Sequence, residues 1–214
     1  MLKIKELLQL LVIIAVELPL EILGYIIVPI ALAFCNKQSE HLPKWARYFE
    51  DASDLYDGEN SAINGDSGWR KEHYPNGKNR TYFARLRWLY RNRIGYFSSR
   101  VNGVKVSEIE PSSVRVQGNP KVTSNGGVIS DFCKVTLKLK DGRSRFGLYK
   151  TIRYKGIFSG FYCRIYVGWK LLDVAEMNEY NKATFLQPDD KVFLKSVWAI
   201  NPFKRVQGSN NAKS

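Results

Sequence analysis

The segment LLQLLVIIAVELPLEILGYIIVPIALAFC, residues 7–35, is the most apolar stretch of this 214-residue chain. Its 29 positions exceed the roughly 20 residues with which a helix crosses about 30 Å of hydrocarbon. Pro19 and Pro29 each remove a backbone hydrogen bond, so we expect a kink or a division into two half-helices. The segment predicts a hydrophobic membrane anchor over residues 1–36.

Two acids interrupt this apolar segment. Glu17 and Glu21 are four residues apart, which places both carboxylates on one face of a helix. An ionised acid near the centre of a bilayer costs about 2.5–3.5 kcal/mol on insertion scales. The surrounding Leu, Ile and Val residues outweigh that cost. We therefore expect Glu17 and Glu21 to be intramembrane polar residues that meet another helix, a second copy of the chain, or water.

Three interpretations of the segment stay open. It is a single kinked transmembrane helix, a re-entrant or interfacial hairpin bent at Pro19, or a cleavable signal peptide with Ala31-Leu32-Ala33 as its cleavage site. The charges that set orientation are nearly balanced between its two ends. The three cysteines, Cys35, Cys133 and Cys163, are too few for a disulfide scaffold, and their odd number suits a reducing compartment. We therefore expect a cytoplasmic C-terminal body.

The body carries a strong positive charge. The whole chain has a formal net charge of +13, and residues 73–214 hold 26 Lys and Arg against nine acids. Such an excess points to an anionic partner, either a membrane surface or a nucleic acid. No motif of catalytic spacing stands out, and the sequence predicts no cofactor. The sequence therefore leaves enzymatic activity open and favours a non-enzymatic protein.

Residues 37–78 read as a linker followed by an acidic, glycine-rich loop. The acids do not follow the ligand spacing of a calcium-binding loop. A looser cluster of oxygen ligands remains a weak metal candidate, and its members would be Asp54, Asp57, Glu59 and Asp66. The simpler interpretation is a solvated loop that pairs with the basic residues downstream.

Residues 79–206 predict a basic α+β domain, and residues 207–214 a polar tail. Apolar residues at helical spacing predict a helix over residues 80–93, with Asn79 as its N-cap. Its aromatic residues and arginines suit an anionic surface or single-stranded nucleic acid, or its aromatics simply form core. The helix contributes five candidate anion-binding residues: Arg80, Arg85, Arg87, Arg91 and Arg93.

An antiparallel sheet is expected after this helix. Residues 131–140 alternate between apolar and polar side chains, and Asp141-Gly142 follows as a two-residue hairpin turn. Residues 145–153 and 161–172 would be the next strands, with residues 114–117 as an earlier edge strand. One sheet face would be wet and basic, and it adds Lys138 and Lys140 to the candidate anion-binding residues. The fold class is thus α+β, with an N-terminal transmembrane or membrane-associated helix.

Several short motifs resemble an uncharacterised family of small tailed-bacteriophage and prophage proteins with an N-terminal hydrophobic segment. The motifs are Leu42-Pro43-Lys44-Trp45, an acidic loop ending in Gly68-Trp69, Arg87-Trp88-Leu89-Tyr90-Arg91-Asn92, Gly168-Trp169-Lys170 and Asn201-Pro202-Phe203-Lys204. Arg93 stands where that family's pattern has a proline. The resemblance implies a phage context and no specific activity.

Taken together, these features predict a phage-encoded, membrane-anchored protein whose role is non-enzymatic interaction at the host inner membrane. Its partners would be the anionic lipid surface and other phage or host membrane proteins. The alternative is a virion or nucleic-acid-associated protein that uses the basic aromatic helix. A membrane-anchored hydrolase is a distant third.

Overall fold

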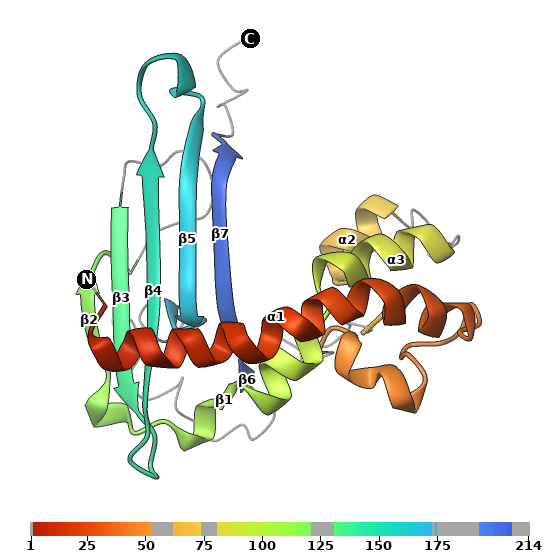
Figure 1. The fold of residues 1–214 in the computed structure, drawn as a ribbon, viewed down its shortest axis with the longest axis horizontal. Helices are drawn as coiled ribbons and strands as arrows, with labels where there is room; N and C mark the ends of the chain where they lie inside the picture. Colours follow the sequence, from red (N-terminus) through yellow and green to blue (C-terminus); the bar gives the residue numbers. More distant parts are fainter. Residues whose placement is uncertain are drawn as a thin grey trace. The chain divides into compact units, whose positions relative to one another are not determined.

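The computed structural model describes residues 2–52, 62–73, 81–120, 131–172, 174 and 193–206. It confirms an α+β fold with an N-terminal apolar helix and an antiparallel sheet (Figure 1). The chain divides into two compact units, each assembled from separate segments. The sheet unit comprises Met1–Ile13, Lys105–Asp190 and Ser196–Ser214, and the helical unit comprises Ile14–Val104 and Lys191–Lys195.

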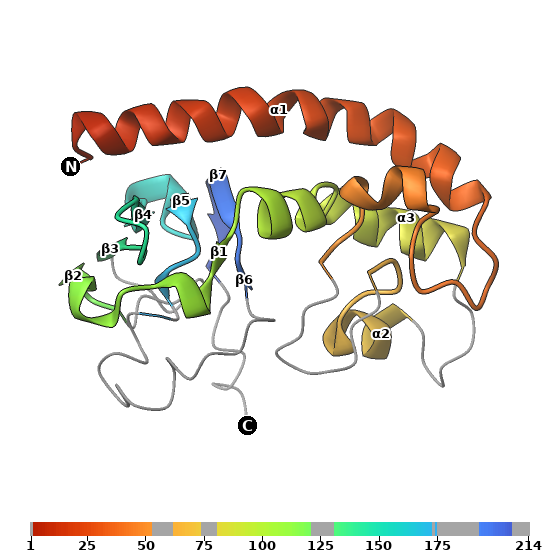
Figure 2. The ribbon, with the colours of Figure 1, turned by 90° about the horizontal axis from the view of Figure 1, so that it is seen from below.

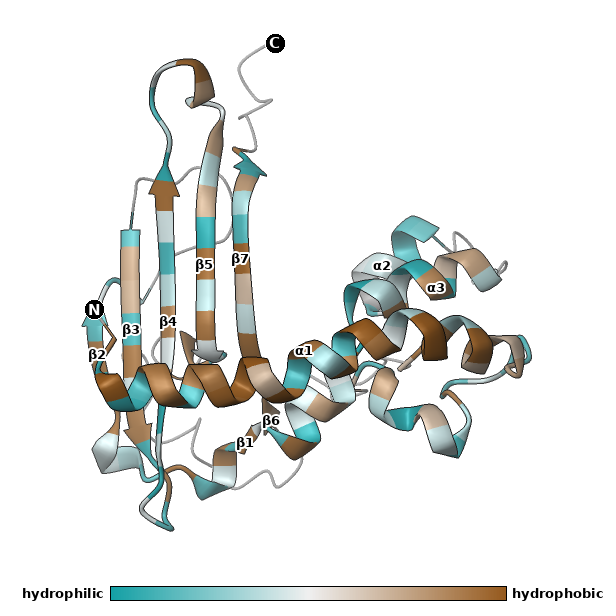
Figure 3. Cartoon of the chain, viewed as in Figure 1, coloured by the Kyte–Doolittle hydropathy of each residue, from teal (hydrophilic) through white to brown (hydrophobic). Residues whose placement is uncertain are grey.

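The N-terminal helix α1 runs without a break over Ile4–Ala33 and contains both Pro19 and Pro29. The prolines therefore do not divide the segment into two half-helices. At 1.5 Å per residue, its length is about 45 Å. Within the described residues, α1 alone has the length and hydropathy to cross a membrane, although a buried core helix or a signal sequence has the same properties. Hydrophobic residues dominate it along its whole length (Figure 3).

The sheet unit contains a five-stranded antiparallel sheet in the order β2-β3-β4-β5-β7. The strands are β2 (Arg115–Gly118), β3 (Asp131–Lys138), β4 (Ser144–Arg153), β5 (Phe161–Trp169) and β7 (Ser196–Arg205). The sequence pattern missed β7. Pro202 lies in this strand, and it is tolerated because β7 is at the edge of the sheet.

Both faces of this sheet are covered in part. The alternation along β3 places Cys133, Val135 and Leu137 on a buried face. The opposite face carries Lys134, and the start of α1 lies along this side of the strands (Figure 2). The sheet face that was predicted to be solvent-exposed is therefore only partly exposed. Short 3-10 turns complete the unit: η4 (Val106–Glu108), η5 (Pro111–Ser113) and η6 (Gly156–Phe158).

The turn between β3 and β4 differs from the prediction. Lys138 pairs with Ser144, and the Leu139 N–H donates to the carbonyl of Arg143, so the loop has three residues, 140–142, instead of two. Gly142 has a φ of +86°, the left-handed conformation with which such three-residue hairpin loops close. Strand β3 therefore ends at Lys138, two residues before the predicted end of the alternation at residue 140.

The helical unit packs the second part of α1 against shorter helices. These are η1 (Lys44–Phe49), α2 (Ser67–His73), α3 (Tyr82–Arg91) and a π-helical turn, η3 (Phe97–Val101). A two-stranded sheet joins β1 (Val104–Lys105) to β6 (Phe193–Leu194). The core combines Val28 and Leu32 of α1 with Trp88 and Leu89 of α3. Trp88 is thus a core residue, which agrees with the interpretation of the helix aromatics as core.

Helix α3 begins later than predicted. Thr81 is its N-cap, and its side chain accepts a hydrogen bond from the Ala84 N–H. Asn79, the predicted cap, lies outside the described residues. Threonine and asparagine are both good N-caps, so a cap preference alone does not distinguish Thr81 from Asn79.

Candidate functional site: an acid-bearing helix stripe and a cationic pocket

Helix α1 has two opposite faces. Its buried stripe includes Glu6, Ile13, Glu17, Gly24 and Val28, at spacings of seven and four that follow the helical repeat. The opposite face exposes large apolar side chains over the same length. These exposed residues are Ile4, Leu7, Leu8, Leu11, Val12, Val16, Leu18, Ile22, Leu23, Tyr25, Ile26 and Ile30. Glu6 and Glu17 of this helix are therefore buried against the rest of the chain, and the apolar residues of its opposite face are exposed.

The two acids predicted to lie within the membrane have partners in the helical unit. Glu17 is 2% exposed, and its Oε1 accepts a hydrogen bond of 3.0 Å from the Asn102 side chain. Glu21 lies 3.4 Å from a guanidinium nitrogen of Arg93, which also stacks on the ring of Tyr25. Both partners lie in the same chain beside other helices, since Asn102 is the C-cap of η3 and Arg93 follows the C-cap of α3. The expectation that these acids also meet a second copy of the chain or water stays a prediction.

A third acid on the stripe, which the sequence analysis passed over, belongs to the sheet unit. The Lys134 Nζ lies 2.7 Å from the Glu6 Oε2, and both side chains are about nine-tenths buried. Glu6 also accepts a hydrogen bond from the Lys3 N–H. A spacing of eleven residues separates Glu6 from Glu17, which is close to three helical turns. That spacing was the signal that all three acids share one face.

The predicted anion-binding arginines of α3 have different environments. Arg87 and Arg91 are exposed, whereas Arg93 pairs with Glu21. Arg80 lies outside the described residues. Arg85 is buried, so its prediction as a surface-binding residue is corrected. The structure therefore does not gather these five arginines on one exposed face.

Arg85 holds together the segment that follows α1. Its Nε donates to the side-chain oxygen of Asn64 at 2.7 Å, and its Nη1 donates to the carbonyl of Asn36 at 2.7 Å. Its Nη2 donates to the carbonyls of Lys37 and Ser39 at 2.8 and 3.2 Å. These four hydrogen bonds make the guanidinium a structural group of the helical unit.

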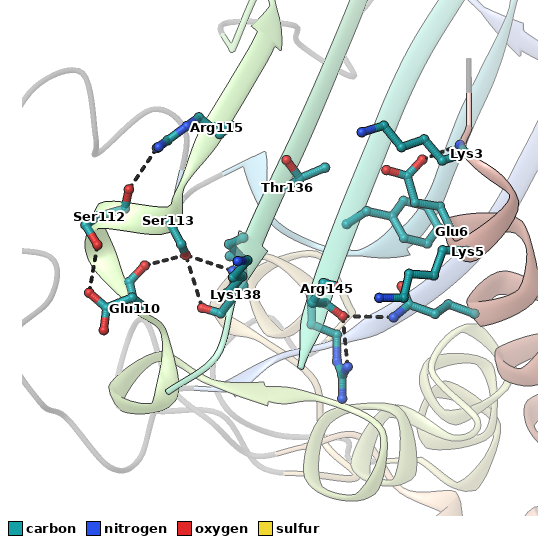
Figure 4. Close-up of a pocket in the computed structure, with 14 residues that line it drawn as sticks. Lys3, Lys5, Glu6, Glu110, Ser112, Ser113, Arg115, Thr136, Lys138 and Arg145 are labelled. Atoms are coloured by element: carbon teal, nitrogen blue, oxygen red, sulfur yellow. Dashed lines mark hydrogen bonds between the residues drawn. The ribbon is translucent and has the colours of Figure 1, made fainter. Parts of the chain in front are cut away.

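The sheet unit contains a pocket of about 610 Å³ between the start of α1, strand β3 and the turn before β2 (Figure 4). Its lining includes five cationic side chains: Lys3, Lys5, Arg115, Lys138 and Arg145. Four hydroxyl residues also line it: Ser112, Ser113, Thr136 and Ser144. Lys138 was predicted from the alternation of β3, whereas Lys140 lies on the loop and does not line the pocket.

The acids that line this pocket have hydrogen-bond or ion-pair donors, whereas most of its cations have no ion-pair partner in the described part of the chain. The two lining acids already have donors, since Glu6 is bound to Lys134 and the Glu110 carboxylate accepts from the Ser112 hydroxyl at 2.9 Å. The ammonium groups of Lys3, Lys5 and Lys138 form no ion pair among the described residues. The pocket therefore offers free positive charge.

Arg145 stands at the edge between pocket and core. Its guanidinium lies over the ring of Trp169 at 4.7 Å, and its Nη1 donates to the carbonyl of Ser144. Its Nε is buried and finds no acceptor within the described residues. Burial, followed by the nearby charge of Arg143, lowers the pKa of Arg145 from its usual value. An anion in the pocket would offset both effects.

Of the four metal candidates, the structure describes Asp66 alone. Asp54, Asp57 and Glu59 lie outside the described residues, and Asp66 caps α2 by accepting a hydrogen bond from the Trp69 N–H at 2.7 Å. No group of three or more potential ligands occurs within the described ranges. The prediction of an oxygen cluster is therefore not tested for its three central members.

A buried carboxylate in the helical unit was missed. The Glu50 carboxylate is 2.8 Å from the His41 Nδ1 and accepts a second hydrogen bond of 2.8 Å from the Leu42 N–H. Burial raises the pKa of Glu50 above its usual value, and the contacts with His41 and Leu42 oppose this rise. Glu50 orders the turn after the α1 segment and is not among the residues that line the pocket of the sheet unit.

Comparison with known proteins identifies the family. Residues 1–207 match the model of a family of unknown function, DUF7338, and the chain belongs to that family. No curated protein and no solved structure matches the chain. The expected resemblance to an uncharacterised family is thus confirmed in its coarser form, since the match carries no phage origin and no activity.

Proposed function

We propose that this chain is a phage-encoded, non-enzymatic protein that associates with the inner membrane of the host through α1. The helix lies along the membrane surface with its exposed apolar face in the lipid, and the two units stay on the aqueous side. The observation that carries this proposal is the division of α1 into an acid-bearing stripe bound by its own protein and an exposed face of large apolar residues.

Lying along the membrane fits these contacts better than crossing it. A helix that crossed the bilayer would separate Glu6 from Lys134 and Glu17 from Asn102, or would draw those partners into hydrocarbon. Either outcome exposes polar groups to a medium without hydrogen-bond donors or acceptors. A helix at the interface keeps every contact, and its apolar face reaches about 5–10 Å into the lipid.

The positive charge of the chain favours an anionic leaflet. Juxtamembrane Lys and Arg residues contribute about 1 kcal/mol each near such a surface. Lys3 and Lys5 precede or begin α1, so they lie at the level of the headgroups in this arrangement. A cytoplasmic location of both units, and interaction with other phage or host membrane proteins, belong to the same proposal.

The first experiment tests the apolar face. Full-length protein in isolated membranes should resist extraction with alkaline carbonate. A Leu11→Glu/Ile22→Glu variant should move to the supernatant with its near-UV circular dichroism unchanged, because both side chains are exposed. Ile157→Glu is the control, since this residue is exposed in η6, away from α1. Membrane retention of the double variant would contradict the proposal.

A second experiment distinguishes a helix on the surface from a helix across the membrane. Single reporter cysteines at Lys3 and Lys37 bracket α1. If the helix lies on the surface, both react with a membrane-impermeant reagent from the same side. Reaction from opposite sides would establish a transmembrane span, and an intact-protein mass lacking α1 would establish a cleaved signal peptide.

A further inference from the structure

We infer that the cationic pocket of the sheet unit is a binding site for a phosphate-bearing anion. The inference rests on the proposed membrane association only for the source of that phosphate, which is either a lipid headgroup or a soluble phosphate compound. The pocket itself belongs wholly to the sheet unit and does not involve the apolar face of α1.

The first argument is convergence. Lys5 comes from the first turn of α1, Lys138 from the end of β3, and Arg115 from the start of β2. These residues lie far apart in the sequence and line one concavity from different sides (Figure 4). Like charges repel when they are brought together, and the two acids of the lining do not balance its five cations, so a bound anion would offset this repulsion.

The second argument is that the acids at the pocket are already engaged. The Glu6 carboxylate is bound by Lys134, and the Glu110 carboxylate by the Ser112 hydroxyl. Among the lining residues five cations stand against these two acids, and Lys134 offsets one of the two from outside the lining. The free charge that faces the cavity is therefore positive.

The third argument concerns the kind of anion. The pocket combines ammonium and guanidinium groups with the hydroxyl of Thr136, whereas the Ser113 hydroxyl already donates to the carbonyl of Glu110 at 2.6 Å. A phosphate has several strong acceptor oxygens, so it can use donors of both kinds at once. The volume of about 610 Å³ is far larger than a bare phosphate and lies in the range of pockets that hold small organic molecules. A phosphate carried on a headgroup or small metabolite therefore fits this space better than a simple ion.

The soluble arm of the test uses the full-length chain in a neutral detergent. Inorganic phosphate and glycerol phosphate are titrated at constant ionic strength, with ³¹P resonance broadening or calorimetry as the readout. Lys138→Gln should weaken binding about tenfold, which corresponds to about 1.4 kcal/mol and the loss of one charged contact. Lys140→Gln is the matched control, because it removes an exposed lysine two residues away that does not line the pocket.

The lipid arm uses vesicles of phosphatidylcholine to which phosphatidic acid or oleate is added to the same surface charge. If the pocket takes a lipid headgroup, the chain floats more strongly with phosphatidic acid than with oleate, and Lys138→Gln abolishes the difference while Lys140→Gln preserves it. If soluble phosphate compounds bind in the first arm and the two kinds of vesicle do not differ, the source is a soluble phosphate.

Equal affinities of the Lys138→Gln and Lys140→Gln variants in both arms would overturn the inference, since charge alone would then explain binding. A different result would overturn the proposed function, namely that membranes retain the Leu11→Glu/Ile22→Glu variant as well as the unchanged chain. The Lys5→Gln variant gives an independent check from the opposite wall of the pocket, and it should weaken binding to a similar extent as Lys138→Gln.

Discussion

The helical unit and the sheet unit use their cations in different ways. In the helical unit, Arg85 is surrounded by carbonyl and amide acceptors and Arg93 is paired with Glu21. In the sheet unit, Lys3, Lys5 and Lys138 face a cavity without an ion-pair partner among the described residues. The comparison teaches that a cluster of cations in a sequence does not identify a binding surface, because the acceptors within reach decide whether the charge is available.

The sharpest way to break this comparison is to remove Arg85. An Arg85→Met variant leaves the carbonyls of Asn36 and Lys37 and the side chain of Asn64 without their donor. The buried Asn64 oxygen costs about 1–3 kcal/mol when it is left unsatisfied, and the two part-buried hydrogen bonds add about 1 kcal/mol each. We therefore expect the free energy of unfolding to fall by about 4 kcal/mol. Urea denaturation measures this change. A variant as stable as the wild type would show that the guanidinium is not a structural donor.

The next largest effect is expected at the ion pair between Lys134 and Glu6. Lys134→Met leaves a buried carboxylate unpaired, which should lower the free energy of unfolding by about 3 kcal/mol. It also turns Glu6 into free negative charge at the pocket, so phosphate binding should weaken. Adding Glu6→Leu should restore most of both losses. A double variant no better than the single one would show that the two residues are not coupled.

The third effect depends on pH. The raised pKa of Glu50 means that the folded chain keeps a proton that the unfolded chain has lost. Stability should therefore fall as pH rises from the ordinary glutamate pKa of about 4.3 through the raised pKa of the folded state, and level off above it. Glu50→Gln should remove this part of the pH dependence in thermal melting curves. An unchanged profile would assign it to other groups.

The smallest effect is expected where a cation has no internal partner. Arg87→Gln in the helical unit and Lys138→Gln in the sheet unit should each change the free energy of unfolding by no more than about 0.5 kcal/mol. Chemical denaturation of both variants measures this. A loss above about 1 kcal/mol at Lys138 would mean that its ammonium supports the fold and is not free to bind.

The sequence predicted the secondary-structure elements better than the long-range contacts that their side chains make. Period-two alternation located β3 and identified Lys138, because alternation alone decides which side chains share a sheet face. The helical repeat likewise placed Glu17 and Glu21 on one face of α1. The partners of those acids, Asn102 and Arg93, lie at least 72 residues away, and no local pattern specifies such pairings.

The pocket illustrates the same limit. Lys5 and Arg145 were absent from the predicted site because they come together only when α1 lies beside the sheet. Arg85 was misassigned for the opposite reason. Its position beside Trp88 and Tyr90 suited a binding helix, while the carbonyls that bury it belong to residues 36–39.

The pairing of Glu6 with Lys134 spans 128 residues and has a consequence for synthesis. At translation rates of about 5–20 residues per second, Glu6 precedes its partner by roughly 6–26 s. During that interval α1 has left or is leaving the ribosome with all its apolar residues uncovered, and with none of the strands against which it later packs. A nascent helix of this kind meets either a chaperone or the membrane first. We expect targeting to precede folding, so that the sheet closes on a helix already held at its final surface.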